Sequence, residues 1–325
     1  MSEGITYLLP LRSRAGDDDV GSLTPYLRWL SGRADLLIVD GSDPPEFAEH
    51  HAAWSSFATH VRPAQDLRCA NGKAWGVLTG LRLARNERVV IADDDIRYDE
   101  AGLCRMGELL ERAELVRPQN YFDPRPWHAH WDTARILINR AIGNDFPGTL
   151  GVRRSFLLAA DGYDGDVLFE NLEMIRTVEA LAGRIVDAPS LFVRRLPPTF
   201  ARFVEQRPRQ AYDDWAQPLR FATFLTVVPI VASAGRRRSR ALALASGLAI
   251  LVANAGRFRD RGRDVFAGVS TLFAPAWLAE RAVLAWMALA RGLVGDGCPY
   301  AGSVIRRAAT SSRALRRRLH PRSSG

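Results

Sequence analysis

The chain has 325 residues, of which 47% are hydrophobic and 25% are charged, so it is long enough to fold as one large domain or two. This balance excludes a disordered or fibrous protein. Its three cysteines are widely separated, and their spacing predicts neither a zinc site nor a disulfide framework. A reducing compartment is therefore expected. The start, MSEGITY, lacks the basic residues and long apolar run of a signal peptide, so we expect no cleaved leader.

The net charge of +8 conceals two halves of opposite sign. Residues 1–218 contain 26 Lys+Arg and 32 Asp+Glu, whereas residues 219–325 contain 18 and 4. We therefore predict a boundary at Pro218, between a mildly acidic front domain and a strongly basic rear. A basic rear suits anionic lipid head groups or nucleic acid, and charge alone does not choose between them.

The first hundred residues alternate between strand and helix patterns. Short apolar runs predict buried strands, and leucines at helical spacing predict helices between them. The strands are expected at 5–11, 35–40 and 89–92, with a weaker extended piece at 61–63 and helices at 23–31 and 71–85. The segment Gly41-Ser-Asp-Pro-Pro45 reads as a turn. This order predicts an α/β fold whose mostly parallel sheet is flanked by crossover helices.

The next hundred residues continue the pattern less regularly. The prolines of Phe122-Asp-Pro-Arg-Pro-Trp127 predict a loop, because proline breaks both regular structures. We expect helices at 100–114, 131–142 and 172–183, extended segments at 115–120 and 149–153, and two short strands at 184–189 and 191–194.

The chemistry is expected around three consecutive aspartates that end the strand at 89–92. Side chains alternate along an extended backbone, so Asp93 and Asp95 face one way and Asp94 faces the other. Two carboxylates on one side of a strand end suit a hard divalent cation such as Mg²⁺ or Mn²⁺. The other interpretation of this stretch is an ordinary acidic turn.

Acidic groups after three strands, followed by an arginine pair, resemble the motif order of a family 2 glycosyltransferase with the GT-A fold, of the membrane-associated type. The residues are Asp40, Asp93 with Asp95, the Glu170 region, and Gln206-Arg207-Pro-Arg209. The resemblance covers roughly residues 5–215. It implies a nucleotide-sugar half at about 1–100 and an acceptor half at about 101–218.

The resemblance implies that Pro10, Arg12 and Asp40 hold the nucleotide. Asp40-Gly-Ser-Asp43 is similar to the Asp-x-Ser-x-Asp loop of the family, although the same four residues also make a good β-turn. Lys73, the only lysine beside 43 arginines, stands in a Gly-Lys segment like that of the family.

The family's Asp-x-Asp motif corresponds to Asp93-Asp94-Asp95, and all three are counted as donor or metal residues. By analogy Asp95 ligates Mn²⁺ or Mg²⁺ directly, and Asp93 contacts the ribose or reaches the metal through water. The cation bridges the two phosphates of the donor and stabilises the departing diphosphate.

Phe169-Glu170-Asn171-Leu-Glu173 resembles the acceptor motif whose aspartate acts as general base. Here Asn171 stands at the position of that aspartate, and its amide accepts no proton. Glu170 is the first candidate for the base and Glu173 the second. The alternative for Glu170 is that it only caps the helix it begins.

Gln206-Arg207-Pro-Arg209-Gln210 is similar to the family's Gln-x-x-Arg-Trp motif, with Gln210 where tryptophan is usual. The guanidinium groups of Arg207 and Arg209 suit a diphosphate, because they stay charged and bind oxygens in pairs.

The rear contains two uncharged runs, 221–235 and 241–256, each shorter than the ~20 residues of a membrane-spanning helix. Arginines follow both runs, and the segment 306–322 holds seven more with no acidic residue. Helices lying in the interface of an anionic membrane fit this pattern. The alternative is a soluble helical region packed on the front domain. The stretch Gly295-Asp-Gly-Cys-Pro-Tyr300-Ala-Gly302 is also similar to tails of membrane-linked family members.

The sequence therefore predicts a metal-dependent, inverting glycosyltransferase on the cytoplasmic side of the cell membrane. It would move a sugar from a nucleotide donor, with UDP expected, to a hydroxyl of a lipid or glycan acceptor. No nucleic-acid partner is expected. Two alternatives stay open. A sugar nucleotidyltransferase should have a glycine-rich loop after the first strand, where only Gly16 occurs; a non-enzymatic basic protein binding membranes or nucleic acid leaves Asp93–Asp95 without a role.

Overall fold

The computed structural model describes residues 4–295, 297–300 and 303–319. Its centre is an eight-stranded sheet with the order β3-β2-β1-β4-β7-β6-β8-β5. Four of the seven strand pairings are parallel, and the antiparallel ones involve β7 and the short β5. The predicted mostly parallel α/β sheet is thus confirmed. The strands are β1 (Ile5–Leu11), β2 (Asp35–Asp40), β3 (Thr59–Val61), β4 (Arg88–Ala92), β5 (Ile96–Arg97), β6 (Leu115–Phe122), β7 (Thr149–Arg153) and β8 (Ile185–Arg195).

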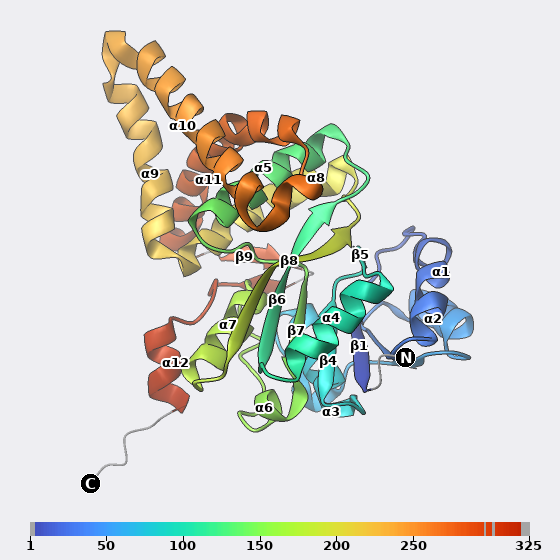
Figure 1. The fold of residues 1–325 in the computed structure, drawn as a ribbon. Coiled ribbons are helices and arrows are strands. Elements are labelled where there is room, and N and C mark those ends of the chain that lie inside the picture. Colours follow the sequence, from blue (N-terminus) through green and yellow to red (C-terminus); the bar gives the residue numbers. More distant parts are fainter. Residues whose placement is uncertain (1–3, 296, 301–302, 320–325) are drawn as a thin grey trace.

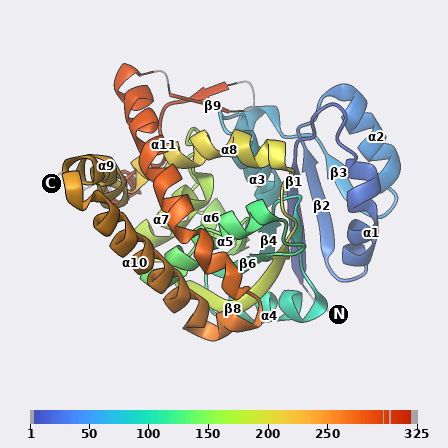
Figure 2. The same cartoon turned by 90° about the horizontal axis from the view of Figure 1, so that it is seen from above.

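Helices cover both faces of the sheet (Figures 1 and 2). Alternate residues of β1 divide between two hydrophobic clusters, with Tyr7 and Leu9 on one face and Leu8 on the other. Helices α1 and α4 pack on the first face, and α3, α6 and α7 on the second. The helices of this part are α1 (Asp19–Ser31), α2 (Pro44–Trp54), η1 (Gln65–Leu67), α3 (Gly72–Leu83), α4 (Glu100–Leu110), α5 (Trp127–Ile142), α6 (Arg154–Leu158), α7 (Glu170–Ala180) and α8 (Phe200–Tyr212).

Several details differ from the sequence-based expectation; helix α5, for example, begins at Trp127, inside the segment expected to be a loop. Helix α2 begins inside the segment expected to be only a turn, because Pro44 and Pro45 occupy its first turn, where a missing N–H costs no hydrogen bond. The two short strands expected at 184–189 and 191–194 are one strand, β8. Its register against β6 shifts between Asp187 and Phe192, so Pro189 lies in an irregular stretch outside the regular ladder.

The C-terminal part is helical, as predicted, and packs on α5 and α8. Phe221 and Trp277 belong to the same hydrophobic cluster as Phe122 and Leu137, so the rear shares a core with the front domain. Helix α9 begins at Pro218, but the division into two domains remains a prediction. The elements are η2 (Asp213–Ala216), α9 (Pro218–Ser233), η3 (Gly235–Arg237), α10 (Arg238–Phe258), η4 (Arg259–Asp264), η5 (Gly268–Phe273), α11 (Ala274–Val294), β9 (Cys298–Tyr300), β10 (Ser303–Ile305) and α12 (Ser312–Leu319).

One buried arginine joins the sheet to the rear helices. Arg140 of α5 is 1% exposed and donates to the Gln119 side chain and to the backbone carbonyls of Pro189, Gly256 and Arg259. The last backbone carbonyls of a helix have no hydrogen-bond partner within the helix. Arg140 donates to the carbonyls at the end of α10, and these bonds also satisfy its own guanidinium. The contact fixes the C-terminal end of α10 against the body. The other end of α10 and α9 form a hairpin that projects away from the body (Figure 1).

The packing of α10 on α5 predicts that alanine substitution at two glycines of α10 changes the free energy of unfolding in opposite directions. A Cβ at Gly256 would lie 1.9 Å from the carbonyl oxygen of Leu137, whereas a Cβ at Gly247 meets nothing within 4 Å. We expect Gly256→Ala to lower the free energy of unfolding by about 2 kcal/mol or more through overpacking. Gly247→Ala should raise it by up to ~1 kcal/mol. Urea unfolding of the two variants measures this, and equal stabilities would contradict the packing of α10.

Candidate active site

Three of the predicted site residues meet around the ammonium group of Lys73. This residue lies in the first turn of α3, where the Asn71 side chain caps the helix by accepting from the backbone N–H groups of Lys73 and Ala74. Lys73 Nζ is 2.6 Å from Asp93 Oδ1 and 2.6 Å from Glu170 Oε1. Desolvation lowers the pKa of Lys73, but the two carboxylates outweigh it and raise this pKa above its ordinary value. Lys73 is therefore a permanent cation that links the end of β4 to the start of α7.

A second cation, Arg195, holds the other side of the aspartate pair. It is the last residue of β8, and its Nε lies 2.9 Å from Asp95 Oδ2 while its NH2 nitrogen lies 3.4 Å from Asp93 Oδ2. Both oxygens of Asp93 are thus paired with cations. Burial raises the pKa of Asp93, and the charges of Lys73 and Arg195 outweigh burial and lower it. Arg195 could not be predicted from the sequence, because its position opposite β5 depends on the antiparallel pairing of β5 with β8.

Two carboxylate oxygens of this cluster are buried without a hydrogen-bond partner among the described residues. They are Asp95 Oδ1 and Glu170 Oε2. Burial raises the pKa of both carboxyls, and it raises the pKa of Asp94 to about 7, reinforced by the charges of Asp95 and Asp93. An unpaired buried carboxylate oxygen is costly, and a cation would satisfy it. The donor set at Asp95 therefore fits the divalent metal that the sequence predicted there.

The three polar residues of the acceptor-like motif in α7, Glu170, Asn171 and Glu173, have different surroundings. Glu170 faces Lys73, as described above. Asn171 donates from Nδ2 to the carbonyl oxygen of Pro147 at 3.0 Å. Glu173 is fully buried, and its Oε2 accepts from the backbone N–H of Thr310 at 2.5 Å. Glu170 is therefore the one member of the motif that the structure places beside Lys73 and Asp93.

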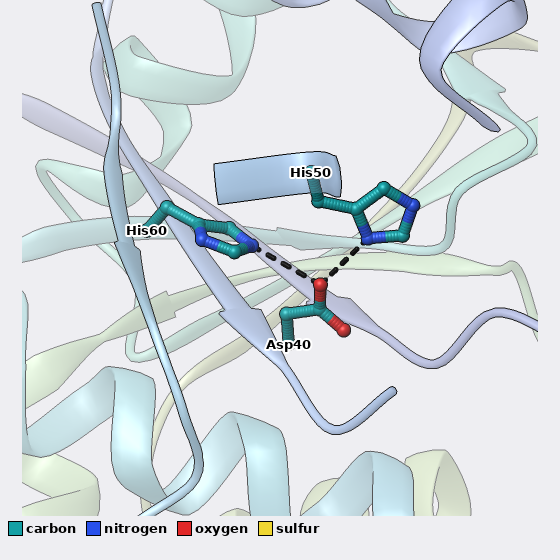
Figure 3. Close-up of side chains that lie close together, drawn as sticks. All are labelled: Asp40, His50 and His60. Atoms are coloured by element: carbon teal, nitrogen blue, oxygen red, sulfur yellow. Dashed lines mark hydrogen bonds and ion pairs between the residues drawn. The ribbon is translucent and has the colours of Figure 1, made fainter. Parts of the chain in front are cut away.

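Asp40 lies in a buried cluster with two histidines (Figure 3). Its Oδ2 is 2.7 Å from Nδ1 of His50 and 3.1 Å from Nε2 of His60, and its Oδ1 accepts from the backbone N–H of Ser42 at 2.8 Å. Burial raises the Asp40 pKa, but the hydrogen bonds from the histidines and Ser42 bring it well below its ordinary value. The carboxylate is 0% exposed, so in this conformation it faces the protein interior and not an open donor site.

The other predicted donor residues lie at several places. Pro10 at the end of β1 is half-buried close to α3, where a Cβ on Gly76 would be 3.0 Å from Pro10 Cβ. Arg12 is exposed on the loop after β1, and Gln206 is half-buried on α8. The donor role of these three residues remains a prediction.

The two arginines of the Gln-x-x-Arg motif point in different directions. Arg207 is buried. Its Nη1 lies 2.6 Å from Asp132 Oδ1 and its Nε lies 2.8 Å from Glu280 Oε1, and these ion pairs connect α8 to α5 and α11. Arg209 has its guanidinium carbon 5.2 Å from the centre of the Tyr300 ring, and its Nε is buried without a hydrogen-bond partner in the described chain. Arg209 is close enough to Asp93 and Glu170 to lower the pKa of both carboxyls. Of the pair, Arg209 is the one that lies near Asp93 and Glu170.

The C-terminal segment 303–310, here called the strap, holds the loop before α7. The backbone N–H groups of Leu168 and Phe169 donate to the carbonyls of Arg307 and Ala308 at 3.0 and 2.8 Å. Ser303 Oγ lies 3.0 Å from the carbonyl of Ala70, just before Lys73. The strap could not be predicted from the sequence, because its partners are more than 130 positions away. The one sequence signal, the Gly295–Gly302 stretch, lies partly outside the described residues.

No family model matches the chain, and no curated protein matches its sequence. Its structure is similar to that of a mannosyltransferase from Pyrobaculum calidifontis, solved in complex with GDP-mannose and Mn²⁺, with a TM-score of 0.55 and 17% identity over 87% of this chain and 86% of that one. Two more distant structures have TM-scores below one half. One is a mannosyl-3-phosphoglycerate synthase from Rubrobacter xylanophilus (0.45, 16% identity, 67% and 74% covered), and the other a glucosyl-3-phosphoglycerate synthase from Mycobacterium tuberculosis (0.42, 16%, 64% and 77%).

The first of these similarities establishes the fold, which is the GT-A fold of nucleotide-sugar glycosyltransferases. The fold class predicted from the sequence is therefore confirmed. At 17% identity the likeness does not by itself establish the reaction.

The strap predicts a specific effect of removing Glu173. In Glu173→Ala, the backbone N–H of Thr310 loses its charged acceptor, and a buried hydrogen bond to a charged group contributes ~1.5–3 kcal/mol. We expect the amides of residues 303–310 to exchange hydrogen at least ~10-fold faster. Glu179→Ala, at an exposed position of the same helix, is the control and should leave the exchange of the strap unchanged. Unchanged hydrogen exchange of residues 303–310 in both variants would contradict the claim that Glu173 holds the strap in place.

The unpaired Asp213 predicts a pH-dependent stability. Burial raises its pKa to about 6, opposed by Arg209 and reinforced by Asp214, and its Oδ1 has no described partner. The folded protein holds this proton more tightly than the unfolded chain, so the contribution is present below about pH 4 and is lost as the pH rises through 6. Asp213→Asn does not titrate, and should be more stable than wild type by about 1–2 kcal/mol at pH 8. Urea unfolding at pH 4.5, 6 and 8 tests this, because the advantage must shrink as the pH falls.

Proposed function

We propose that this chain is a metal-assisted, inverting glycosyltransferase that moves a sugar from a nucleoside diphosphate donor to a hydroxyl group. The observation that carries the proposal is a charged array at one edge of the sheet in a GT-A fold. Asp93, Asp95 and Arg195 lie at the ends of β4 and β8, and Lys73 and Glu170 lie in the first turns of α3 and α7. Ligands bind outside the carboxyl ends of strands in sheets of this kind. The similar mannosyltransferase was solved with GDP-mannose and Mn²⁺, which supports a nucleotide-sugar donor and a divalent cation here.

In this proposal the acidic residues bind the metal and the cationic residues interact with the diphosphate of the donor. Asp95 holds Mn²⁺ or Mg²⁺ through its unpaired Oδ1, and the bound cation supplies positive charge to the diphosphate. Asp93, with both oxygens paired to Lys73 and Arg195, acts through those cations. Arg209 offers its unpartnered Nε to diphosphate oxygens, since a guanidinium stays charged and binds them in pairs.

Glu170 is the proposed general base. Burial raises the pKa of its carboxyl, the Lys73 charge opposes this, and Oε2 is free to accept a proton. The acceptor oxygen attacks the anomeric carbon, its proton passes to Glu170, and the bond to the diphosphate oxygen breaks with the electron pair leaving on the nucleoside diphosphate. One displacement of this kind inverts the anomeric carbon. Asn171 cannot replace Glu170, because its side chain has no titratable group.

The proposed donor is a nucleoside diphosphate sugar, with UDP expected from the sequence. Asp40, the residue expected to bind the base, is buried between His50 and His60. We therefore propose that the donor base is bound by the loop that follows Asp40, and the donor panel below includes GDP- and dTDP-sugars beside UDP-sugars.

We also propose that the acceptor is located at a membrane, on the cytoplasmic side. The hairpin of α9 and α10 carries exposed apolar side chains on its outer part and arginines at its turn, namely Ile230, Leu242, Leu244, Leu248, Leu251, Arg237, Arg238 and Arg240. Helices 238–264 and 268–294 are long and apolar enough to cross a membrane. Because Ala249 and Ala253 of α10 are buried in the protein core, docking of the outer hairpin at the interface fits better than a span. A lipid or membrane-bound glycan would then present the accepting hydroxyl.

The reaction predicts strong effects of two isosteric substitutions. We expect purified protein with Mn²⁺ to release nucleoside diphosphate from one member of a panel of UDP-, GDP- and dTDP-sugars. Glu170→Gln and Asp95→Asn should each lower the rate at least ~100-fold, since they remove the base and the direct metal ligand. Glu179→Gln, exposed on the same helix, is the control. Turnover that survives chelation of the metal, or is unchanged by Glu170→Gln, would contradict the mechanism.

Membrane docking predicts that acidic substitutions on the hairpin abolish binding to vesicles. We expect wild-type protein to float with vesicles containing 30 mol% anionic lipid, and the triple variant Leu244→Glu, Leu248→Glu, Leu251→Glu to stay at the bottom of the gradient. These residues are 63–75% exposed, so the fold should tolerate the change. The control carries Leu83→Glu and Ile142→Glu, also exposed apolar residues. Equal recovery of both variants would rule out docking by this hairpin.

A further inference from the structure

Three of the six histidines of the chain gather beside Asp40 at the edge of the sheet. His50 and His51 lie on α2, and His60 lies on the edge strand β3. The Nδ1 of His50 and the Nε2 of His60 both point at Oδ2 of Asp40 (Figure 3), at 2.7 and 3.1 Å. These three atoms all lie within 4.8 Å of one another. The side chains of Asp40, His50 and His60 are at most 4% exposed, so their facing atoms are closed off from solvent.

Further contacts surround Asp40, His50 and His60 on the sides that face away from one another. Asp40 Oδ1 accepts from the backbone N–H of Ser42 at 2.8 Å, and Nδ1 of His60 is 3.2 Å from Nδ1 of His51. The His50 ring stacks on Trp54 with a centroid distance of 4.5 Å. Such contacts fix the ring orientation and tautomer of histidines that bind metals. One donor atom of each residue is thus within reach of a single cation, and hydrogen bonds or ring stacking hold the other sides of these side chains.

We propose that Asp40, His50 and His60 form a zinc site. Two imidazole nitrogens and one carboxylate oxygen are donors that Zn²⁺ takes at ~2.0–2.2 Å, and three protein ligands leave one coordination position. The two imidazole nitrogens favour Zn²⁺ at this site. The site at Asp95 offers carboxylate oxygens, which suit Mn²⁺ or Mg²⁺. The buried carboxylate also needs compensating positive charge, which a bound cation provides.

Zinc binding requires no other reactant. When both rings are neutral and no metal is bound, the ring nitrogens that face Asp40 donate N–H groups to it. On binding, the proton of each ligating nitrogen moves to the other nitrogen of the same ring, and the ligating nitrogen gives its lone pair to the metal. For His60 this places an N–H on Nδ1, opposite Nδ1 of His51, which accepts it. No net proton is gained or lost when both rings start neutral.

The site would join three consecutive elements, the end of β2, helix α2 and strand β3. Strand β3 has only three residues and pairs on one side with β2. A metal that crosslinks these elements stabilises the folded state, because it binds the folded chain and not the unfolded one. This role does not depend on the proposed glycosyl transfer.

The test is zinc binding by the full chain. We expect protein stripped with a chelator to bind one equivalent of Zn²⁺, measured by competition with a chromophoric chelator, and to take up Co²⁺ with the visible absorption bands of a tetrahedral site. His50→Gln and His60→Gln should each weaken binding at least ~100-fold. The melting temperature of the wild type should rise by on the order of 3 °C or more with Zn²⁺.

Two controls separate this site from others. His130→Gln, whose ring bonds to Ser270 outside the cluster, and Asp95→Asn should both keep full zinc affinity. If His60→Gln does not fold, His51→Gln leaves the ligands intact and should weaken zinc binding ~10-fold through the lost contact to His60. Binding of less than a tenth of an equivalent, or equal affinity in the wild type and in His50→Gln and His51→Gln, would overturn the proposal.

Discussion

The structure depends on the ion pair that Lys73 makes with two carboxylates at once. Asp93 ends a strand of the first half and Glu170 begins a helix of the second, and both are within 2.6 Å of the same ammonium nitrogen. Without this cation, buried carboxylates brought together at one edge of the sheet would repel each other and lose solvation with no compensation. Arg195 neutralises the opposite side, so the acids stay close while Asp95 and Glu170 each keep one oxygen free.

The same cluster explains why the distant C-terminal segment belongs to the site. Glu170 has its position only because α7 and the loop before it are fixed, and the strap fixes them through Arg307, Ala308 and Thr310. The rear helices carry the strap, and α10 is anchored to the body by Arg140 and by the close approach at Gly256. The basic rear thus has two roles in our account, in supporting the catalytic loop and in presenting an exposed apolar hairpin to a membrane.

The sequence predicted what depends on local pattern and left out what depends on long-range pairing. The strands β1, β2 and β4 followed from their apolar runs, whereas the placement of Asp93, Lys73 and Glu170 in one site was implied only by the resemblance in motif order. Arg195 was missed because a residue opposite β5 is known only once β5 and β8 pair. Pro44 and Pro45 indicated a turn, whereas they occupy the first turn of helix α2, and the two short strands expected around Pro189 are one strand with an irregular stretch. The burial of Asp40 could not be predicted, because His50 and His60 approach it only when α2 and β3 fold over the end of β2.

The most direct measurement of the central claim is a double-mutant cycle between Lys73 and Glu170. Lys73→Met and Glu170→Gln remove each charge while nearly preserving shape, and the free energies of unfolding of the wild type, the two single variants and the double variant give their coupling. For groups in contact in a buried cluster we expect a coupling of about 1–3 kcal/mol, with the double variant less destabilised than the sum of the single ones. A coupling of zero within error would mean that Lys73 does not join the two halves of the site, and the account would fail.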